Sequence, residues 1–388
     1  MGEGTLAERV EAFAVEVVRP RSAAMARGEL GSPRWLVEAA GERGLAGLLV
    51  PEEYGGAGAG HLEFADAVER IARECASTSV AYDVHVSVAS EPLVLFGTEE
   101  QRARYLPRLA SGQWVGGFAL SEPGSGSDAA ALTTRATRVA GGWRLDGAKS
   151  WITNAGAADL FMLLARTGET GARGISAFLV EASWPGVHAE TPLHKLGLRG
   201  SWTAGLVLDG VEVPEANLLG QEGGGFRVAM ATLDSGRVGI SAQATGIAQG
   251  ALDAAAAHLR GLGMGGAMDR VVAAGGELGE PAASWLPGPA GRLAGMAAAT
   301  AAARALCRHA ATLCDAGVAF TREAAIAKLV ATDTAVAVAH EAVEMCAPDS
   351  HDEGHPASVR LRDAKACQIY EGTNQVQRIV IARELLRR

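Results

Sequence analysis

The hydrophobic period of this chain of 388 residues changes twice, and each change constrains the fold. Up to about residue 113, apolar residues recur at intervals of three and four, as in HLEFADAVERIARECAST, which predicts amphipathic helices. From Trp114 the interval becomes two, in short runs such as DLFMLLARTG that end at Gly, Asp and Asn turns, which predicts a β-sandwich or barrel. From about residue 221 the helical period returns. We therefore predict a mostly α protein with a central β domain, divided into residues 1–113, 114–220 and 221–388.

Charge and cysteine content argue against several classes of function. The formal net charge of −9, without a concentrated basic patch, argues against nucleic-acid binding. The charged N-terminal stretch MGEGTLAERVEAF and the lack of eighteen consecutive apolar residues argue against membrane insertion, so we expect a cytoplasmic protein. No CxxC pair occurs, which predicts buried, reduced thiols at Cys75, Cys307, Cys314, Cys346 and Cys367.

Two histidines raise the question of a metal site. His351 and His355 in PDSHDEGHP are four residues apart, with Asp349 and Asp352 nearby. Gly354 and the flanking prolines predict a loop, in which the two histidines would not share a helix face. We therefore predict no metal site.

The C-terminal helical segments are rich in alanine and carry few charges on several faces, as in AGMAAATAAARALCRHAATLCDAG. A helix that is apolar nearly all round is normally buried. Packing against another subunit and packing inside the chain both explain this pattern, and the sequence does not separate them.

Two segments of the β domain could contact a flat ligand. FALSEPGSGSD, residues 118–128, combines small residues with the hydroxyls of Ser121 and Ser127, although a plain turn explains it equally well. It is not a GxGxxG motif, so the dinucleotide-fold argument does not apply. In KSWITN, Trp151 and Thr153 alternate on one strand, where they could cover and hydrogen-bond a heterocycle or belong to the core.

Near the C-terminus, QIYEGTNQVQR places Glu371 between a tyrosine and a glycine. One interpretation is a solvated carboxylate beside a glycine that ends a helix. The other is a catalytic base.

Five separated motifs occur in the order and spacing of the acyl-CoA dehydrogenase family, which the chain resembles from end to end. They are FALSEPGSGSD, KSWITN, LGLRGSWT, VLDGVEVPEANLLGQEGGGF and LRDAKACQIYEGTNQVQRIVIARELL. The resemblance implies an N-terminal helical domain, a middle β domain and a C-terminal four-helix bundle. It also implies FAD bound between the subunits of a homotetramer or dimer, an acyl-CoA substrate, and an electron-transferring flavoprotein as acceptor.

The resemblance also implies roles for individual residues. Glu371 corresponds to the base that removes the α-proton of the acyl thioester, while the β-hydrogen leaves as hydride to flavin N5 and a trans-2-enoyl-CoA forms. The position of an alternative base in one branch of the family is occupied here by Gly236. The implied cofactor contacts are Phe118, Leu120, Ser121, Gly126, Ser127, Trp151, Thr153, Thr373 and Gln375. The implied substrate contacts are Ser127, Asp234, Arg237, Tyr370 and Gly372.

Two departures from the family pattern fall on the half of the site expected to bind the FAD adenosine. Residues 261–292 lack the family's R-x-x-F-G segment, whose arginine would make a charge-assisted contact with the pyrophosphate. CAPDSHDEG replaces the family's GGxG turn. We therefore expect an active dehydrogenase with a rebuilt adenosine pocket. The alternatives are a flavoenzyme for acyl carrier protein thioesters or oxygen chemistry, and a flavin-poor scaffold.

Overall fold

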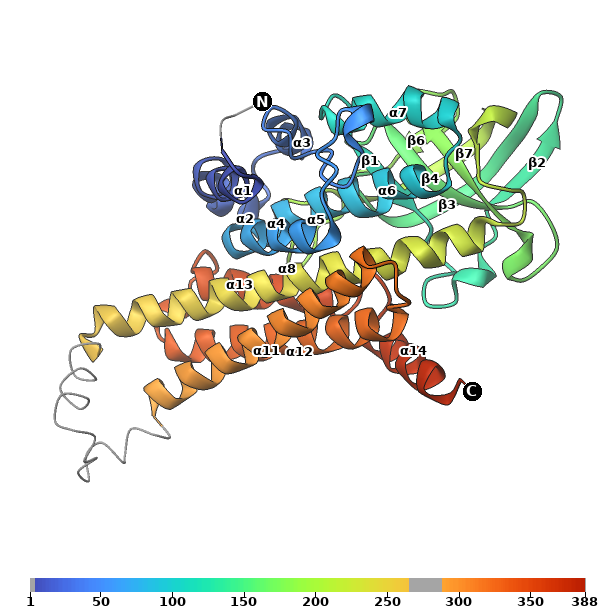
Figure 1. Ribbon diagram of the computed structural model, residues 1–388. Helices are drawn as coiled ribbons and strands as arrows, with labels where there is room; N and C mark the ends of the chain where they lie inside the picture. Colours follow the sequence, from blue (N-terminus) through green and yellow to red (C-terminus); the bar gives the residue numbers. More distant parts are fainter. Residues whose placement is uncertain (1–3, 265–287, 388) are drawn as a thin grey trace.

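The computed structural model describes residues 4–264 and 288–387. Helices of the N-terminal part and a twisted sheet lie on one side of a long helix, α8 (Gly225–Gly261), and long C-terminal helices lie on its other side (Figure 1). The predicted order of a helical part, a β part and a second helical part is confirmed.

The N-terminal part is helical, as its hydrophobic period predicts. Residues of α4 at three- and four-residue spacing, such as Phe64, Val68 and Ile71, are buried in the core of this part. The helices are α1 (Leu6–Ala12), α2 (Ser22–Arg27), α3 (Arg34–Gly41), α4 (His61–Glu74), α5 (Ala76–Asp83), α6 (Glu91–Phe96) and α7 (Glu99–Ala110), with π-helical turns at Phe13–Val18 and Val84–Ser90.

Helix α7 begins at a capping box. The Thr98 hydroxyl accepts a hydrogen bond from the Gln101 N–H at 3.3 Å, and the Gln101 side chain accepts one from the Thr98 N–H at 3.0 Å.

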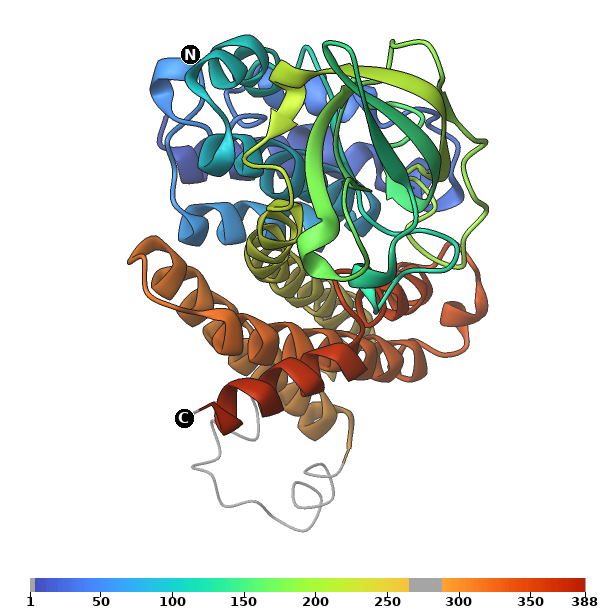
Figure 2. The same cartoon turned by 90° about the vertical axis from the view of Figure 1, so that its right-hand side faces the viewer.

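The β part forms one mixed sheet of eight strands with the order β6-β7-β3-β2-β4-β5-β8, and β1 pairs with β4. The prediction of a central β domain is confirmed, but its strands join through hydrogen bonds into one twisted sheet, whereas a sandwich has two facing sheets (Figure 2). The strands are β1 (Gly116–Ala119), β2 (Arg135–Val139), β3 (Gly142–Thr153), β4 (Leu160–Arg166), β5 (Ile175–Glu181), β6 (Val187–Ala189), β7 (Thr203–Pro214) and β8 (Leu218–Leu219).

The strands at the centre of the sheet are buried on both faces. Alternate residues of β4 enter two different cores: Met162 and Leu164 pack with α7 residues, and Phe161 and Leu163 pack with residues of β3 and β7. This explains why the sequence of β4 is continuously apolar from Leu160 to Ala165.

The C-terminal part is a bundle of α8, α11 (Pro289–Asp315), α12 (Thr321–Met345) and α13 (Pro356–Cys367), with α14 (Asn374–Leu386) packed on α12. Small residues such as Ala335, Ala339 and Ala342 fill the space between the helices. Packing within the chain therefore accounts for much of the alanine-rich pattern. Ile379, Leu385 and Leu386 on α14 nevertheless remain exposed.

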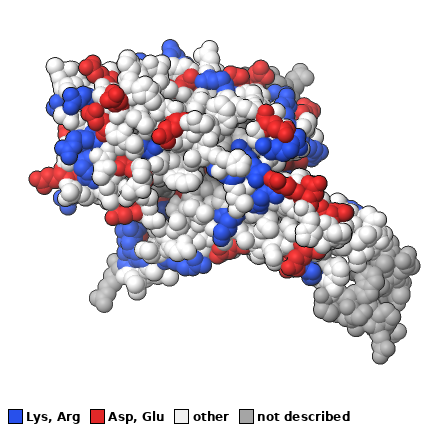
Figure 3. All heavy atoms as spheres, turned by 180° about the vertical axis from the view of Figure 1, so that it is seen from behind, with Lys and Arg blue, Asp and Glu red and all other residues white. Residues whose placement is uncertain are grey.

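The surface and the helices give two further results. On the face drawn in Figure 3, Lys and Arg side chains are interspersed with Asp and Glu. Among the described residues, no helix is long and apolar enough to cross a membrane. The proposed domain limits fall in connecting segments, between α7 and β1 and between β8 and α8.

Candidate active site

The site is built around the turn that joins α13 to α14. Glu371 has φ of 54° and the following Gly372 has φ of 84°, so two consecutive residues adopt the left-handed conformation. For glycine this is inexpensive, whereas for glutamate it is strained and must be held by neighbouring contacts. Lys328 Nζ and Gln377 Nε2 supply them by donating to the Gly372 carbonyl at 2.8 and 2.9 Å.

The Glu371 carboxyl group is withdrawn from water although the residue as a whole stays partly exposed. Its Oε2 is buried and has no hydrogen-bond partner among the described residues. Burial raises the pKa of Glu371 from 4.5 to about 7, against the lowering effects of Arg237 and Lys328. A carboxyl group with this pKa exchanges protons near neutral pH, as a general base requires.

Helix α8 gives the carboxyl group its space. A Cβ at Gly236 would lie 2.6 Å from Glu371 Oε2 and 3.0 Å from Val88 Cγ1. Gly236 and Glu371 therefore face each other directly, so the position that carries a base in one branch of the family adjoins the predicted base here. The site has room for one of the two carboxylates.

Lys328 on α12 is a site residue that the sequence reasoning missed. Its side chain is fully buried, and its Nζ also donates to Asn374 Oδ1 at 3.0 Å. Burial lowers the pKa of Lys328 to about 8, although Cys367 and Glu371 nearby raise it. A lone lysine in the apolar run AAIAKLVA is the signal that could have drawn attention to it.

Asp234 and Arg237, the two predicted substrate contacts on α8, form an ion pair with each other. Arg237 Nη1 donates to Asp234 Oδ1, and Thr321 donates to Asp234 Oδ2 at 2.7 Å. Arg237 is buried, and its Nε has no partner among the described residues. The hydroxyl of Tyr370, which precedes the base, donates to Gln243 on α8 and so fixes the turn to the same helix.

Two segments for which the sequence suggests contact with a flat ligand lie side by side, and we call them the walls: residues 118–128, in and after β1, and residues 149–154, at the end of β3. The Ser150 N–H donates to the Ser121 carbonyl at 2.9 Å, which joins the segment after β1 to β3. A bulge in the pairing of β3 with β7 lies between Lys149 and Ile152 and turns the indole of Trp151 outward, with φ of 62° and 65% exposure.

The burial of the wall residues suits a bound ring. Ile152 is buried, and Trp151 and Thr153 on either side of it are not, as expected for two residues on the other face. No hydrogen bond joins the Ser121 or Thr153 hydroxyl to a described residue. Both hydroxyls are thus free to serve a ligand. Phe118 is half-buried and Leu120 is buried.

The other predicted contact residues lie in more open positions. Gly126 and Ser127 are exposed in the turn after β1, and Gln375 is exposed on α14. The Thr373 hydroxyl caps α14 by accepting from the Val376 N–H at 3.2 Å. The cofactor and substrate roles of these residues remain predictions.

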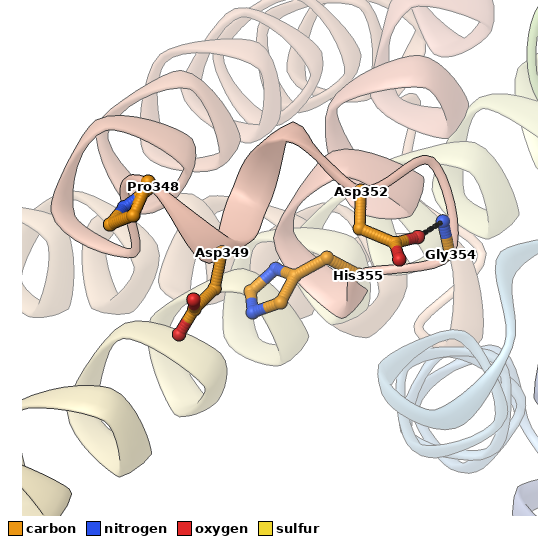
Figure 4. A pocket seen from close by; sticks show the side chains of 5 residues that line it. All are labelled: Pro348, Asp349, Asp352, Gly354 and His355. Carbon is orange, nitrogen blue, oxygen red and sulfur yellow. Dashed lines mark hydrogen bonds between the residues drawn. The ribbon is translucent and has the colours of Figure 1, made fainter.

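A surface pocket lies away from the base, in the turn between α12 and α13 (Figure 4). His355 accepts a hydrogen bond from the Ala357 N–H at 3.2 Å and caps α13, which uses one ring nitrogen in the fold. No group of three or more His, Cys, Asp or Glu side chains in the described ranges could hold a metal ion. The residues that line the pocket are Pro348, Asp349, Asp352, Gly354 and His355.

Comparison with known proteins identifies the relatives of this chain. Models of the acyl-CoA dehydrogenase N-terminal, middle and C-terminal domains match residues 3–113, 117–211, and 223–271 with 284–386. An acyl-CoA dehydrogenase of Bacillus subtilis is 44% identical over 97% of this chain and 96% of its own length. The human mitochondrial short-chain specific acyl-CoA dehydrogenase is 42% identical over 92% of this chain and 83% of its own length.

A solved structure of a related enzyme has the same fold. Butyryl-CoA dehydrogenase from Megasphaera elsdenii superimposes with a TM-score of 0.88 at 35% identity, covering 100% of both chains. The fold and the matches define a flavoprotein oxidoreductase that acts on acyl-CoA thioesters. The chain belongs to the acyl-CoA dehydrogenase family, whose members depend on FAD.

Proposed function

We propose that this protein dehydrogenates short-chain acyl-CoA thioesters to trans-2-enoyl-CoA products, with Glu371 as the base. The observation that carries the proposal is the buried Glu371 Oε2, which has no partner in the described part of the chain and belongs to a carboxyl group with a pKa of about 7. The short-chain preference is supported by relatives named as short-chain specific and butyryl-CoA dehydrogenases.

The proton that Glu371 removes is weakly acidic, so the thioester carbonyl must be stabilised as negative charge develops on its oxygen. No hydrogen bond from the Glu371 N–H is found to a described residue, which leaves this donor free for the substrate. A backbone donor aimed at a developing oxyanion is typically worth about 2.7 to 4 kcal/mol. Gly372, without a side chain, leaves room for the thioester at the backbone.

The residues of the two walls fit the FAD on which the family depends. The outward indole of Trp151 offers a flat apolar surface, and the hydroxyls of Ser121 and Thr153 offer hydrogen bonds to a polar ring edge. When bound, the flavin supplies the acceptor for the hydride that leaves the β-carbon. Phe118 and Leu120 would pack beside the ring, while Thr373 and Gln375 would contact the cofactor near the base.

The adenosine half of FAD would meet the part of the site in which this chain departs from the family pattern. Residues 265–287, which contain most of the segment without the family's arginine, lie outside the described residues. The altered turn after α12 lines the pocket around Asp349 and His355. We propose that this chain holds the adenosine with groups different from the family's arginine.

Three further properties complete the proposal. Exposed Ile379, Leu385 and Leu386 on α14 support a homo-oligomer, a dimer or a tetramer, in which this helix contacts another subunit. Reduced flavin would pass its electrons to an electron-transferring flavoprotein. The place of action would be the cytoplasm.

The test is an anaerobic titration of the purified flavoprotein with saturated acyl-CoAs of increasing length, followed by flavin absorbance. Butyryl-CoA should bleach the flavin more readily than long-chain esters. Glu371→Gln should bind the ester and reduce flavin at least about 10³-fold more slowly, because it cannot accept the α-proton. Turnover retained in this variant would refute the base assignment.

Other outcomes of the same titration point to the alternatives. Bleaching by an acyl carrier protein thioester but by no CoA ester would indicate a carrier-protein enzyme. Protein purified without flavin from riboflavin-supplemented cells would indicate a scaffold.

A further inference from the structure

We propose that the buried ion pair between Lys149 and Glu122 is a positioning device that holds the two flavin-facing walls together, an inference that rests on the proposed function. Neither residue is among the expected cofactor contacts. Each stands beside one of them: Glu122 follows Ser121, and Lys149 is two residues before Trp151.

The pair is fully enclosed. The side chains of Lys149 and Glu122 are 0% and 3% exposed, and Lys149 Nζ lies 2.8 Å from Glu122 Oε1. Lys149 Nζ also donates to the carbonyl of Leu120 at 3.1 Å. One ammonium group therefore binds the chain on both sides of Ser121, the first wall residue whose hydroxyl is free.

The carboxylate extends the connection to a third segment. Glu122 Oε2 accepts from the Thr133 N–H at 2.6 Å and from its hydroxyl at 2.8 Å, and Oε1 accepts from the Thr134 N–H at 2.9 Å. Burial by itself would raise the pKa of Glu122, but the charge and hydrogen bond of Lys149 lower it to about 2. Glu122 is therefore ionised, and both of its oxygens are used.

The ion pair lies where the two walls come together. The bulge that turns Trp151 outward begins at Lys149, where the regular pairing of β3 with β7 is interrupted. Next to the bulge, the hydrogen bond from Ser150 N–H to the Ser121 carbonyl is the single backbone link between the two walls that the structure describes. The ion pair adds a charged link at the base of the bulge, so the distance between Ser121 and Trp151 depends on it.

A well-packed apolar pair would fill the same space but could not hold the segments together, because the backbone N–H groups of Thr133 and Thr134 would lose their acceptors. Buried ion pairs are also costly to desolvate, so stability alone is a weak reason for having one. A role in fixing geometry accounts for both features.

The test compares FAD release from three holoenzyme variants with release from the wild type. Lys149→Met keeps the aliphatic stem but removes the charged link. Glu122→Gln removes the negative charge and keeps one acceptor oxygen, which can serve Thr133 or Thr134 but not both. We expect both variants to raise the FAD dissociation constant at least about tenfold, measured by the rise of flavin fluorescence on dilution, and to change the visible circular dichroism of the bound flavin.

Asn217→Ala is the matched control. Asn217 is buried, and its Nδ2 donates to the Tyr105 hydroxyl at 2.7 Å and to the Leu179 carbonyl at 2.8 Å, at the β8 end of the sheet. This variant should lower the melting temperature as the other two do, yet release FAD like the wild type.

The outcomes separate this inference from the proposed function. If the two pair variants lose melting temperature like Asn217→Ala but keep the wild-type FAD dissociation constant and circular dichroism, the pair is only structural and the inference is overturned. If Lys149→Met does not fold, the FAD dissociation constant and the circular dichroism of Glu122→Gln decide whether the inference holds. A wild type that holds no flavin would overturn the proposed function and this inference together.

Discussion

Glu371 and Gly236 are far apart in the sequence, but the carboxyl group of Glu371 lies against the backbone of Gly236, which has no side chain. The contact determines which of the two positions can bear the proposed base, because a side chain at residue 236 would occupy the place of Oε2. The pKa of the base depends on the same enclosure, since burial is its largest cause.

The pH dependence of the reaction should report this enclosure. Glu371 must be ionised to accept the α-proton, so with a pKa raised to about 7 the rate should fall as the pH drops below about 7. Stopped-flow flavin reduction at saturating butyryl-CoA, measured from about pH 5.5 to 8.5, should show a midpoint near 7. A rate that stays constant down to pH 5.5, as the ordinary pKa of 4.5 would give, would contradict the burial argument.

Gly236→Ala should lower kcat while leaving the stability of the fold nearly unchanged. Its new Cβ would lie 2.6 Å from Glu371 Oε2, so the carboxyl group must move, and we expect kcat to fall by about tenfold or more. Stability should change little or rise by up to about 1 kcal/mol, because alanine favours the helix.

Gly295→Ala on α11 is the control for this change. A Cβ there meets nothing within 4 Å, so the variant should keep full activity. Equal kcat values for both alanine variants in the butyryl-CoA assay would show that Gly236 does not govern the position of the base.

At the scale of elements, three helices hold one strained turn. The α13–α14 connection is tied to α12 through Lys328, to α8 through Tyr370, and to the first turns of α14 through Gln377. The strain of a glutamate in the left-handed region is thus offset by contacts from several elements.

Lys328→Met should loosen this turn and raise the pKa of the base. The ammonium group donates to the Gly372 carbonyl and Asn374, and its charge lowers the pKa of Glu371. We expect the midpoint of the pH profile of flavin reduction to move upward, with a loss of stability of about 1 to 3 kcal/mol from the unsatisfied carbonyl. Lys365→Met on the exposed side of α13 is the control and should change neither quantity.

The sequence predicts elements better than it predicts contacts between them. The Thr98 capping box depends on residues three apart, and the strand period of β4 is visible in a single run, so both could be predicted. The role of Lys328 depends on a carbonyl 44 residues away and was missed. The bulge at Trp151 was also missed, because it arises from the register of β3 against β7 and has no local signal.

For the whole molecule, one buried cluster connects the N-terminal helices to the bundle. His61 on α4 lies 2.7 Å from Glu91 Oε1 on α6, 3.1 Å from Ser235 Oγ on α8 and 3.3 Å from Asp315 Oδ1 at the end of α11. Burial by itself would lower the pKa of His61, but hydrogen bonds with Cys314 and Glu91 raise it to about 11.

This cluster predicts a pH-dependent contribution to stability. Because the folded pKa of His61 exceeds its ordinary value of 6.5, the stabilisation is fully present below pH 6.5 and is lost as the pH rises toward 11. His61→Gln should lower the free energy of unfolding by about 3 kcal/mol near pH 6, because it leaves the buried carboxylate of Glu91 without its charged partner. Urea unfolding of both proteins should give a smaller difference near pH 10, and a difference that grows with pH would exclude a charged His61.

The arrangement of the whole molecule could be predicted because its three regions differ in period over long stretches. The meeting of Glu371 with α8, and of Ser121 with β3, could not be read from period or spacing. These contacts were inferred only through the resemblance to a family, which carries the tertiary information that a single sequence lacks.

The turn that holds Glu371 comes long after the wall segments in the sequence, and this order has a consequence for biosynthesis. The wall segments end at Asn154, about 200 residues before the base, which corresponds to roughly 10 to 40 s of translation. During that interval the nascent chain contains both wall segments but not the proposed base. On the proposed function, reactivity toward thioesters therefore arises only after the turn between α13 and α14 has been made and has docked against α8 and α12.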